Sequence, residues 1–394
     1  MDNASISAGE FEDSSPMPRY SVSFLTPAEV GQSPAVLAAW QDLLGQSTNL
    51  YRLYQSPEWW NHQGSVHSGL QRSLGVVRDG KDAVVGVVPL QIGHHAISFW
   101  LGSRNLGRMR FRTIDLLGSH PLLPDDENAY RQLFRSICDF FSDCRSIRMF
   151  NVIRESWCCR YFEAANSQNE KNWFLYSGEN PRLFHIVRVP ATFEEYMKKF
   201  SSKRRHALRR EMKILEQRGA GDLQLERIEN VEQIDRFLAI ARPLFDRSWK
   251  AGILPTCLEG GKPHFEDLAR RGILRAYLLR CGDSYCAYVI GYQFRDVYHG
   301  IENAHDSAFN EYSPGKVMQL LVIEDLTNHT PPEKFSFGFG NQDYKVQLGT
   351  DHAEDATIVL MRRTLANRFK CGCHQTFRSS VRAIKRGLGR NTPT

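Results

Sequence analysis

Apolar and polar positions follow one another along the chain in two successive series that predict the same order of elements. In the first series, helical spacing covers 27–44, with Thr26 as its cap, and a second capped helix begins at Ser56. Strands and a later helix then follow. The strands are expected at 74–77, 84–90, 97–101 and 148–153, a further strand-like segment is expected to end at 115–118, and the helix is expected at 130–141. The 74–90 segment is predicted to be a hairpin, because an Asp-Gly turn lies between β-branched runs.

The second series repeats this order. It opens with a predicted helix at 192–217, whose Thr192 and Glu195 form a capping box. The remaining predicted elements are helices at 234–249 and 317–326 and strands at 274–279, 285–294, 297–301, 334–339 and 357–361. Two long series in one order indicate a duplicated fold rather than a short repeat. The irregular segment 155–181 is the predicted junction between the copies.

A length of 394 residues is too great for one ordinary core, so two domains are expected. The predicted fold class is α/β (α+β), each domain being a mixed, mostly antiparallel sheet flanked by helices. The expected division is a disordered N-terminus at 1–20, domains at 21–180 and 181–365, and a basic tail at 366–394.

Composition narrows the class of protein. No run of about 18 apolar residues is present, which argues against a transmembrane helix. Residues 1–15 are acidic and polar and lack the features of a secretory signal, so a cytoplasmic protein is predicted. Nine scattered cysteines favour reduced thiols over a disulfide framework. Cys371, Cys373 and His374 lack a second ligand pair at zinc-finger spacing, so no metal is predicted.

The formal net charge of +6 is concentrated in two basic segments, 198–213 and 362–390, which suit anionic partners. In the tail, Phe377, Val381, Ile384 and Leu388 follow helical spacing. Such a segment is more often a packed terminal helix. The alternative is an amphipathic helix that places the protein at the periphery of an anionic membrane.

Three groups of residues could carry chemistry. Ser313, Gly315 and Lys316 stand between a strand and a helix, where backbone N–H groups can hold a pyrophosphate, although Ser-Pro-Gly is also an ordinary helix-initiating turn. The next group lies where a strand ends in Gly338 and Gly340.

After those glycines, Tyr344 could act as general acid and Lys345 could meet a phosphate, or the tyrosine could simply pack inward. His299 and Glu302 are candidate bases for removing a proton from an acceptor. On a regular strand they point to opposite faces, so both can serve one site only if the strand bulges.

Several enzyme classes lack their motifs here. The chain has no Walker phosphate loop, GxSxG, HExxH, or GxGxxG in a suitable setting. ATPase, serine hydrolase, zinc protease and dehydrogenase activities are therefore not indicated. No activated cysteine or serine is apparent either, which favours direct transfer in a ternary complex.

Six ordered segments resemble the CelD/BcsL group of GNAT-superfamily acetyltransferases, associated with bacterial polysaccharide biosynthesis. They are Ser56-Pro57-Glu58-Trp59, residues 85–90, 202–205 with 208–210, 247–250, 313–315, and 338–340 followed by Tyr344-Lys345. Ser336 departs from the pattern, because the family often has an acidic residue there.

The resemblance implies two tandem GNAT-like domains and transfer of an acyl group, expected to be acetyl, from acetyl-CoA or another acyl-CoA. The acceptor would be an amine or hydroxyl of a sugar or glycolipid. The implied roles are donor binding by Ser313, Gly315, Lys316, Gly338 and Gly340, substrate binding by Lys203, Arg204, Arg205, Trp249 and Lys345, and catalysis by Tyr344, Glu302 and His299.

Two other functions remain open. Fem-type transferases have a similar tandem fold and use aminoacyl-tRNA, and the basic helix and tail favour that activity mildly. Nucleic acid is otherwise not expected as a partner, because no reader motif is present. The third alternative is a non-catalytic regulatory or scaffolding protein that keeps only the fold, for which Ser336 is the support in the sequence.

Overall fold

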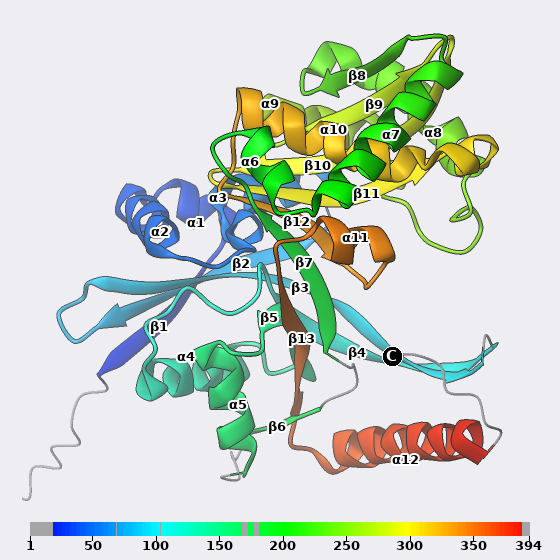
Figure 1. The fold of residues 1–394 in the computed structure, drawn as a ribbon. Helices are drawn as coiled ribbons and strands as arrows, with labels where there is room; N and C mark the ends of the chain where they lie inside the picture. Colours follow the sequence, from blue (N-terminus) through cyan, green and yellow to red (C-terminus); the bar gives the residue numbers. More distant parts are fainter. Residues whose placement is uncertain (1–18, 68, 103, 168–171, 177–180, 388–394) are drawn as a thin grey trace, which may run out of the picture.

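The computed structural model describes residues 19–387, apart from 68, 103, 168–171 and 177–180. The predicted disorder of 1–20 thus falls almost wholly outside the described residues. The strands form one 13-stranded sheet of order β1-β2-β3-β4-β5-β13-β7-β12-β11-β10-β9-β8, with β6 paired to β13 (Figure 1). No helix in the described part of the chain has the length and apolar character needed to cross a bilayer.

The first series of elements builds one half of the sheet. Its strands are β1 (Tyr20–Leu25), β2 (Gln71–Asp79), β3 (Val84–Leu101), β4 (Arg104–Leu116), β5 (Ser146–Ile153) and β6 (Trp173–Leu175). Its helices are α1 (Pro27–Gly31), α2 (Pro34–Gln46), η1 (Arg52–Gln55), α3 (Pro57–Val66), α4 (Glu127–Phe140) and α5 (Trp157–Ser167). Neighbours from β1 to β4 are antiparallel, and β5 runs parallel to β4.

The second series repeats the plan. The strand β7 (Arg182–Arg188) precedes it and ends the first series; the strands of the second series are β8 (Leu223–Ile228), β9 (Ala276–Cys281), β10 (Ser284–Phe294), β11 (Val297–His305), β12 (Lys334–Phe339) and β13 (Asp351–Arg362). Its helices are α6 (Phe193–Lys198), α7 (Ser202–Arg218), η2 (Val231–Gln233), α8 (Ile234–Asp246), η3 (Cys257–Gly260), α9 (Gly261–Arg270), η4 (Ser307–Tyr312), α10 (Pro314–His329), α11 (Asp343–Leu348) and α12 (Leu365–Gly387). Neighbours from β8 to β11 are antiparallel, and β12 runs parallel to β11.

The two halves exchange one strand each. The strand β7 ends the first series in the chain, yet it pairs with β12 of the second half. The strand β13 follows β12 in the chain, yet it pairs with β5 of the first half. An antiparallel pairing between β13 and β7 then joins the halves into one continuous sheet. The predicted duplication is therefore present, and each half is completed by a strand from the other series.

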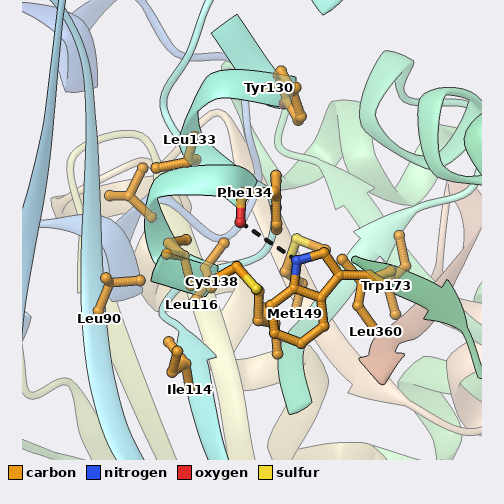
Figure 2. Packing of buried hydrophobic residues seen from close by; sticks show 14 of the residues in the cluster. Leu90, Ile114, Leu116, Tyr130, Leu133, Phe134, Cys138, Met149, Trp173 and Leu360 are labelled. Carbon is orange, nitrogen blue, oxygen red and sulfur yellow. Dashed lines mark hydrogen bonds between the residues drawn. The ribbon is translucent and has the colours of Figure 1, made fainter. Parts of the chain in front are cut away.

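Each half has helices on both faces of the sheet. In the first half, α4 and α5 cover a core that includes Phe134, Met149, Trp173 and Leu360, the last of which is supplied by β13. Figure 2 shows this packing, in which the Trp173 Nε1 donates to the Phe134 carbonyl at 3.4 Å. In the second half, α6, α7 and α10 cover one face and α8 and α9 the other.

Several expected boundaries are corrected. The helix predicted at 27–44 is two helices, because Pro34 cannot donate a backbone hydrogen bond and starts a new one. The helix predicted at 192–217 breaks between α6 and α7, where Phe200 turns into the core and the Ser201 hydroxyl accepts from the Arg204 amide at 3.3 Å. The strand expected at 97–101 is the end of the long strand β3.

Other segments differ from the predicted elements, and the C-terminal tail agrees with its prediction. The junction at 155–181, predicted to be irregular, contains α5 and β6, because Cys158, Cys159 and Phe162 bury against the first core. Strands β1, β7 and β8 were not predicted. The basic tail is helical, as its spacing indicated, and forms α12 up to residue 387.

Candidate functional site

The second half of the sheet opens between β11 and β12. These parallel strands pair at only three positions, from Val297 opposite Lys334 to His299 opposite Ser336. Gly300 and Gly338 follow directly. A Cβ atom added to Gly300 would lie 3.2 Å from the Ser336 carbonyl oxygen, and one added to Gly338 would lie 3.2 Å from the Gly300 carbonyl oxygen. The glycines therefore allow the two backbones to approach where the strands separate.

Strand β11 bulges at this point. Gly300 lies opposite Gly291 and Glu302 opposite Ile290, so Ile301 is an additional residue with no partner of its own across the ladder. His299 lies opposite Tyr292, which is two residues from Ile290 and hence on the same face of β10. The bulge thus turns the side chains of His299 and Glu302 to the same face of the sheet. On a regular strand they would point to opposite faces and could not both serve one site.

The two side chains nevertheless have different surroundings. The His299 ring is buried against Tyr51 and Tyr54 of the first half, with ring centroids 6.2 and 5.7 Å away. Its Nε2 atom has no hydrogen-bond partner among the described residues. Burial lowers the pKa of His299 to about 4, so the imidazole is neutral at physiological pH. His299 does not line the cavity that lies between β11 and β12.

A cavity of about 250 Å³ occupies the opening between β11 and β12. It brings together residues from five parts of the second half. They are Phe245, Trp249, Lys250, Leu254 and Pro255 after or within α8; Val289, Gly300, Ile301, Glu302 and Asn303 of the central strands; Gln319 of α10; Phe337 and Phe339 of β12; and Gln342, Tyr344 and Lys345 at α11. Four of the predicted site residues, Trp249, Glu302, Tyr344 and Lys345, therefore share one cavity.

Glu302 is held firmly in the wall of this cavity. Its Oε1 accepts hydrogen bonds from the Tyr288 hydroxyl at 2.5 Å and the Thr256 hydroxyl at 2.8 Å. Its Oε2 accepts from the Cys257 backbone N–H at 2.8 Å. These donors fix the position of the carboxylate. The result is a negatively charged group of defined orientation beside the opening.

Tyr344 is oriented as a proton donor. The Asn303 Nδ2 donates to the Tyr344 hydroxyl oxygen at 3.0 Å, which leaves the hydroxyl hydrogen for another partner. Burial raises the pKa of Tyr344, so the phenol remains protonated at neutral pH. A neutral phenol in a cavity can donate its proton to an anion that forms there.

Two lysines make part of the cavity positive. The Lys250 Nζ donates to the carbonyl and side-chain oxygens of Asn303, at 2.5 and 3.0 Å, and the Lys345 Nζ donates to the Phe339 carbonyl. Burial, followed by repulsion from Lys250, lowers the pKa of Lys345 to about 8. Burial also lowers the pKa of Lys250. Two partly desolvated cations favour an anionic group between or beside them.

The turn before α10 lies outside the residues that line the cavity. Ser313 has a left-handed backbone, with φ of 51°, and its carbonyl accepts from the Lys316 and Val317 amides at 3.1 Å each. The Lys316 Nζ forms an ion pair with Glu211 of α7 at 2.6 Å. Two of the amides expected to meet a pyrophosphate are thus bonded within the turn, and the lysine has a carboxylate partner. Their role in donor binding stays a prediction.

The remaining predicted residues are not among those that line the cavity. Gly340, with φ of 104°, directly follows β12, and its amide donates to the Leu183 carbonyl at 3.1 Å. On α7, Arg204 bonds to the Gln347 side chain of α11, the helix that carries Tyr344 and Lys345. Arg205 donates to the Phe200 carbonyl at 2.6 Å, and Lys203 is exposed.

Sequence reasoning missed Lys250, Asn303 and Gln319. Lys250 stands next to Trp249 in the segment 247–250 that carries the resemblance, but it was given no role; Asn303 stands next to Glu302 and belongs to none of the segments that carry the resemblance. The one signal for the bulge was a glycine in each of two adjoining strands, Gly291 and Gly300, since interior strand glycines often mark bulges.

The corresponding place in the first half is built differently, beside a hollow of about 1290 Å³ that is lined in part by Asn49, His120 and Ile153. Strands β4 and β5 pair from Thr113 to Leu116 and then separate. The segment that follows is held by side chains of the same half: Asn49 Nδ2 donates to the Gly118 carbonyl at 3.0 Å, Gln55 Nε2 to the His120 carbonyl at 2.5 Å, and Ser119 Oγ to the Asn151 carbonyl at 2.9 Å. Within the described ranges, no group of three His, Cys, Asp or Glu side chains is arranged to hold a metal ion.

Comparisons with known proteins agree with this architecture. Residues 202–346, which contain β11, α10, β12 and most of α11, match the family model described as an acetyltransferase (GNAT) domain. No curated protein matches the sequence significantly. Many solved structures match the fold, among them the following two. The crystal structure of FemX is 11% identical with a TM-score of 0.58, over 82% of this chain and 95% of that chain.

The second is a tandem GNAT protein from the clavulanic acid biosynthesis pathway, which is 13% identical with a TM-score of 0.51, over 87% of this chain and 98% of that chain. At these identities the two structures show the fold alone. The chain therefore has a tandem GNAT-like fold, and the family match supports a transferase of the GNAT superfamily. The narrower resemblance to the CelD/BcsL group remains a prediction.

Proposed function

We propose that the protein is an acyltransferase that moves an acyl group, expected to be acetyl, from acyl-CoA to an amine or hydroxyl of a sugar or glycolipid-type acceptor. One observation carries the proposal: the opening between β11 and β12 contains a carboxylate, a protonated phenol and two lysines. The reaction is assigned to the second half, in which the residues matched by the GNAT family model also lie.

The residues of the cavity fit a direct transfer. The acceptor nitrogen or oxygen forms a bond to the thioester carbonyl carbon, and the carbon–sulfur bond breaks. Glu302, held by Tyr288, Thr256 and Cys257, takes the proton that the acceptor loses. The Tyr344 hydroxyl gives its proton to the departing thiolate. Backbone amides at the bulge would polarise the thioester carbonyl.

The two lysines indicate the kind of acceptor. A cavity that holds Lys250 and Lys345 suits a molecule with an anionic group, such as a sugar phosphate or sugar nucleotide, more than a neutral sugar. An anion bound there would relieve the repulsion between the lysines. An acceptor of this class is consistent with polysaccharide biosynthesis, the role that the resemblance implies.

Thermal unfolding with acetyl-CoA, together with release of free thiol from acetyl-CoA or longer acyl-CoAs, tests the proposal. Ligand at 100 times its Kd stabilises a folded protein by about 2.7 kcal/mol, so a clear rise in Tm is expected. Amino sugars, sugar phosphates and sugar nucleotides serve as acceptors. No rise in Tm at millimolar acetyl-CoA and no thiol release with any acceptor would refute an acyl-CoA donor and leave the aminoacyl-tRNA and scaffolding alternatives.

A pair of glycine variants separates cavity binding from general effects. Gly300→Val places bulk where a Cβ already lies 3.2 Å from the Ser336 carbonyl, at the opening itself. Gly93→Val makes the same change in β3, at a position where a Cβ meets no atom within 4 Å. The first variant should lose the acetyl-CoA response and the second should keep it. A full response in Gly300→Val would place the donor elsewhere.

Aminoacyl-tRNA is the alternative donor, and the exposed cations of α7 favour it. Lys203, Arg209, Arg210 and Lys213 all face solvent. If tRNA binds there, affinity should fall steeply with salt, because phosphate contacts release counterions. Salt-sensitive tRNA binding without any acetyl-CoA response would select this alternative.

A further inference from the structure

The hairpin formed by β3 and β4 extends beyond the rest of the sheet. Its outer part pairs strand to strand as far as Leu101 opposite Arg104. The neighbouring strand β2 pairs with β3 only up to Ile92, and β5 pairs with β4 only from Thr113. Residues 93–102 and 104–112 therefore form a two-stranded ribbon, with which no third strand pairs in the described part of the chain. Such ribbons are marginally stable in water unless one face is covered.

Helix α12 covers one face of this ribbon. Phe99 packs edge-on against His374 and Phe377, with ring centroids 5.1 and 5.2 Å away, and Ile97 and Phe111 share a small core with Cys371. The His374 Nε2 lies 3.2 Å from the Ser98 carbonyl. Trp100 at the hairpin end and Val381 and Arg382 of α12 line one hollow of about 470 Å³. The hairpin end and the C-terminal part of α12 thus lie side by side.

These two elements expose large apolar side chains, which are unfavourable on a surface that faces only water. Trp100, Leu101 and Leu106 at the hairpin end are 53, 45 and 58% exposed. On α12, Leu365, Phe369 and Ile384 are also exposed. Six of the eleven large apolar side chains that the described chain exposes therefore lie on two elements. A concentration of this kind marks a surface that binds something.

The same two elements are strongly basic. The segments 94–112 and 365–387 contain four and six arginines or lysines respectively, and neither contains an aspartate or glutamate. Arg104, Arg108 and Arg110 are exposed on β4, and Arg382 is exposed on α12. We call the hairpin end and the C-terminal part of α12 the hairpin–helix surface: Trp100, Leu101, Leu106, Ile384, Arg104, Arg108, Arg110 and Arg382. In Figure 1 these parts lie at the same side of the molecule.

We propose that the hairpin–helix surface docks on an anionic lipid bilayer. Trp100, Leu101 and Leu106 enter the interface between head groups and acyl chains, where tryptophan and aliphatic side chains are both stabilised. The arginines bind lipid phosphates. Nucleic acid fits less well, because its bases offer stacking faces to aromatic rings but no apolar phase for the two leucines. This docking would present the protein to a lipid-linked acceptor, yet it does not depend on the proposed transfer.

Co-sedimentation with phosphatidylglycerol–phosphatidylcholine vesicles, and with phosphatidylcholine vesicles alone, tests the proposal. Binding should require the anionic lipid and weaken with salt. The variants W100S/L101S/L106S and R104E/R108E/R110E should each reduce the bound fraction by about tenfold or more. The matched control K203E/R210E/K213E makes the same charge change on α7 and should bind within about twofold of the parent. Equal loss in the control, or no loss in either hairpin variant, overturns the proposal.

Two further measurements keep the result decisive if a hairpin variant folds poorly. Trp100→Phe preserves an apolar ring, so it should still bind vesicles while losing part of the tryptophan quenching caused by brominated acyl chains. Unchanged quenching would show that Trp100 stays out of the lipid and would overturn the proposal. If R104E/R108E/R110E loses tRNA binding but keeps vesicle binding, the surface serves nucleic acid instead.

Discussion

Because the two halves exchange strands, a substitution in a strand of one series should destabilise the other half of the fold. Leu360 lies in β13, late in the chain, but it is buried in the core of the first half with Met149 and Trp173 (Figure 2). Val187 lies in β7, which ends the first series, but it is fully buried in the core of the second half. Truncation of each should destabilise the half in which the side chain packs.

The magnitudes follow from the atoms removed. Leu360→Ala deletes three carbons, which at about 0.8 kcal/mol each is a transfer loss of about 2.4 kcal/mol. The cavity left behind brings the expected cost to about 3–4 kcal/mol. Val187→Ala deletes two carbons, so about 2–3 kcal/mol is expected by the same argument.

Native-state hydrogen exchange followed by mass spectrometry reports these losses segment by segment. Leu360→Ala should reduce protection in α4 and β5 more than in β10 and β11, and Val187→Ala should do the reverse. Each variant is the control for the other. If Leu360→Ala lowered protection chiefly in β10 and β11, or if both variants affected the two halves equally, the exchanged topology or the independence of the two cores would be refuted.

Three further predictions concern the cavity. Tyr344→Phe should lower kcat by about a hundredfold or more with the acetyl-CoA shift in Tm retained, and an unchanged kcat would contradict its role as acid. The pKa of Lys345 is about 8 in the folded protein and about 10.4 in the unfolded chain. Between these two pH values the unfolded chain binds more protons than the folded protein. The contribution of Lys345 to the free energy of unfolding therefore becomes more favourable as the pH rises through this window. Denaturant unfolding at pH 7 and pH 10 should therefore favour the parent increasingly over Lys345→Met, whereas parallel stabilities would contradict the lowered pKa. His299→Phe should keep most of the activity, because the residue lies outside the cavity and its Nε2 has no partner there to lose; a fall in kcat of a hundredfold would make it the base after all.

Local pattern was sufficient to predict most strands and the duplicated order, because alternation and helical spacing are properties of short segments. The break between α6 and α7 was missed, since the apolar spacing continues through Phe200 while the chain turns there. The exchange of β7 and β13 could not be predicted at all. Which sheet edge a strand joins depends on the tertiary packing of residues such as Leu360, and its own alternation carries no such information.

Prediction of the candidate site from the sequence was limited in the same way. Trp249, Glu302, Tyr344 and Lys345 were found from their chemistry and order, and the structure brings all four to one cavity. The alternation of a regular strand placed His299 and Glu302 on opposite faces, and one additional residue at Ile301 reverses that relation. A bulge is a property of two paired strands, so a single strand cannot reveal it.

Contacts between the two halves also explain where His299 lies. In the first half, Asn49 bonds to Gln55 and to the Gly118 carbonyl, and Gln55 bonds to the His120 carbonyl, which holds η1 and the residues before it in place. The same segment carries Tyr51 and Tyr54. Their rings pack against His299, which is the last residue of β11 that pairs with β12 before the two strands separate. The first half thus supports the strand that forms the cavity in the second half. A buried, neutral His299 fits this contact, because a charged imidazole would lie against aromatic rings without a counterion.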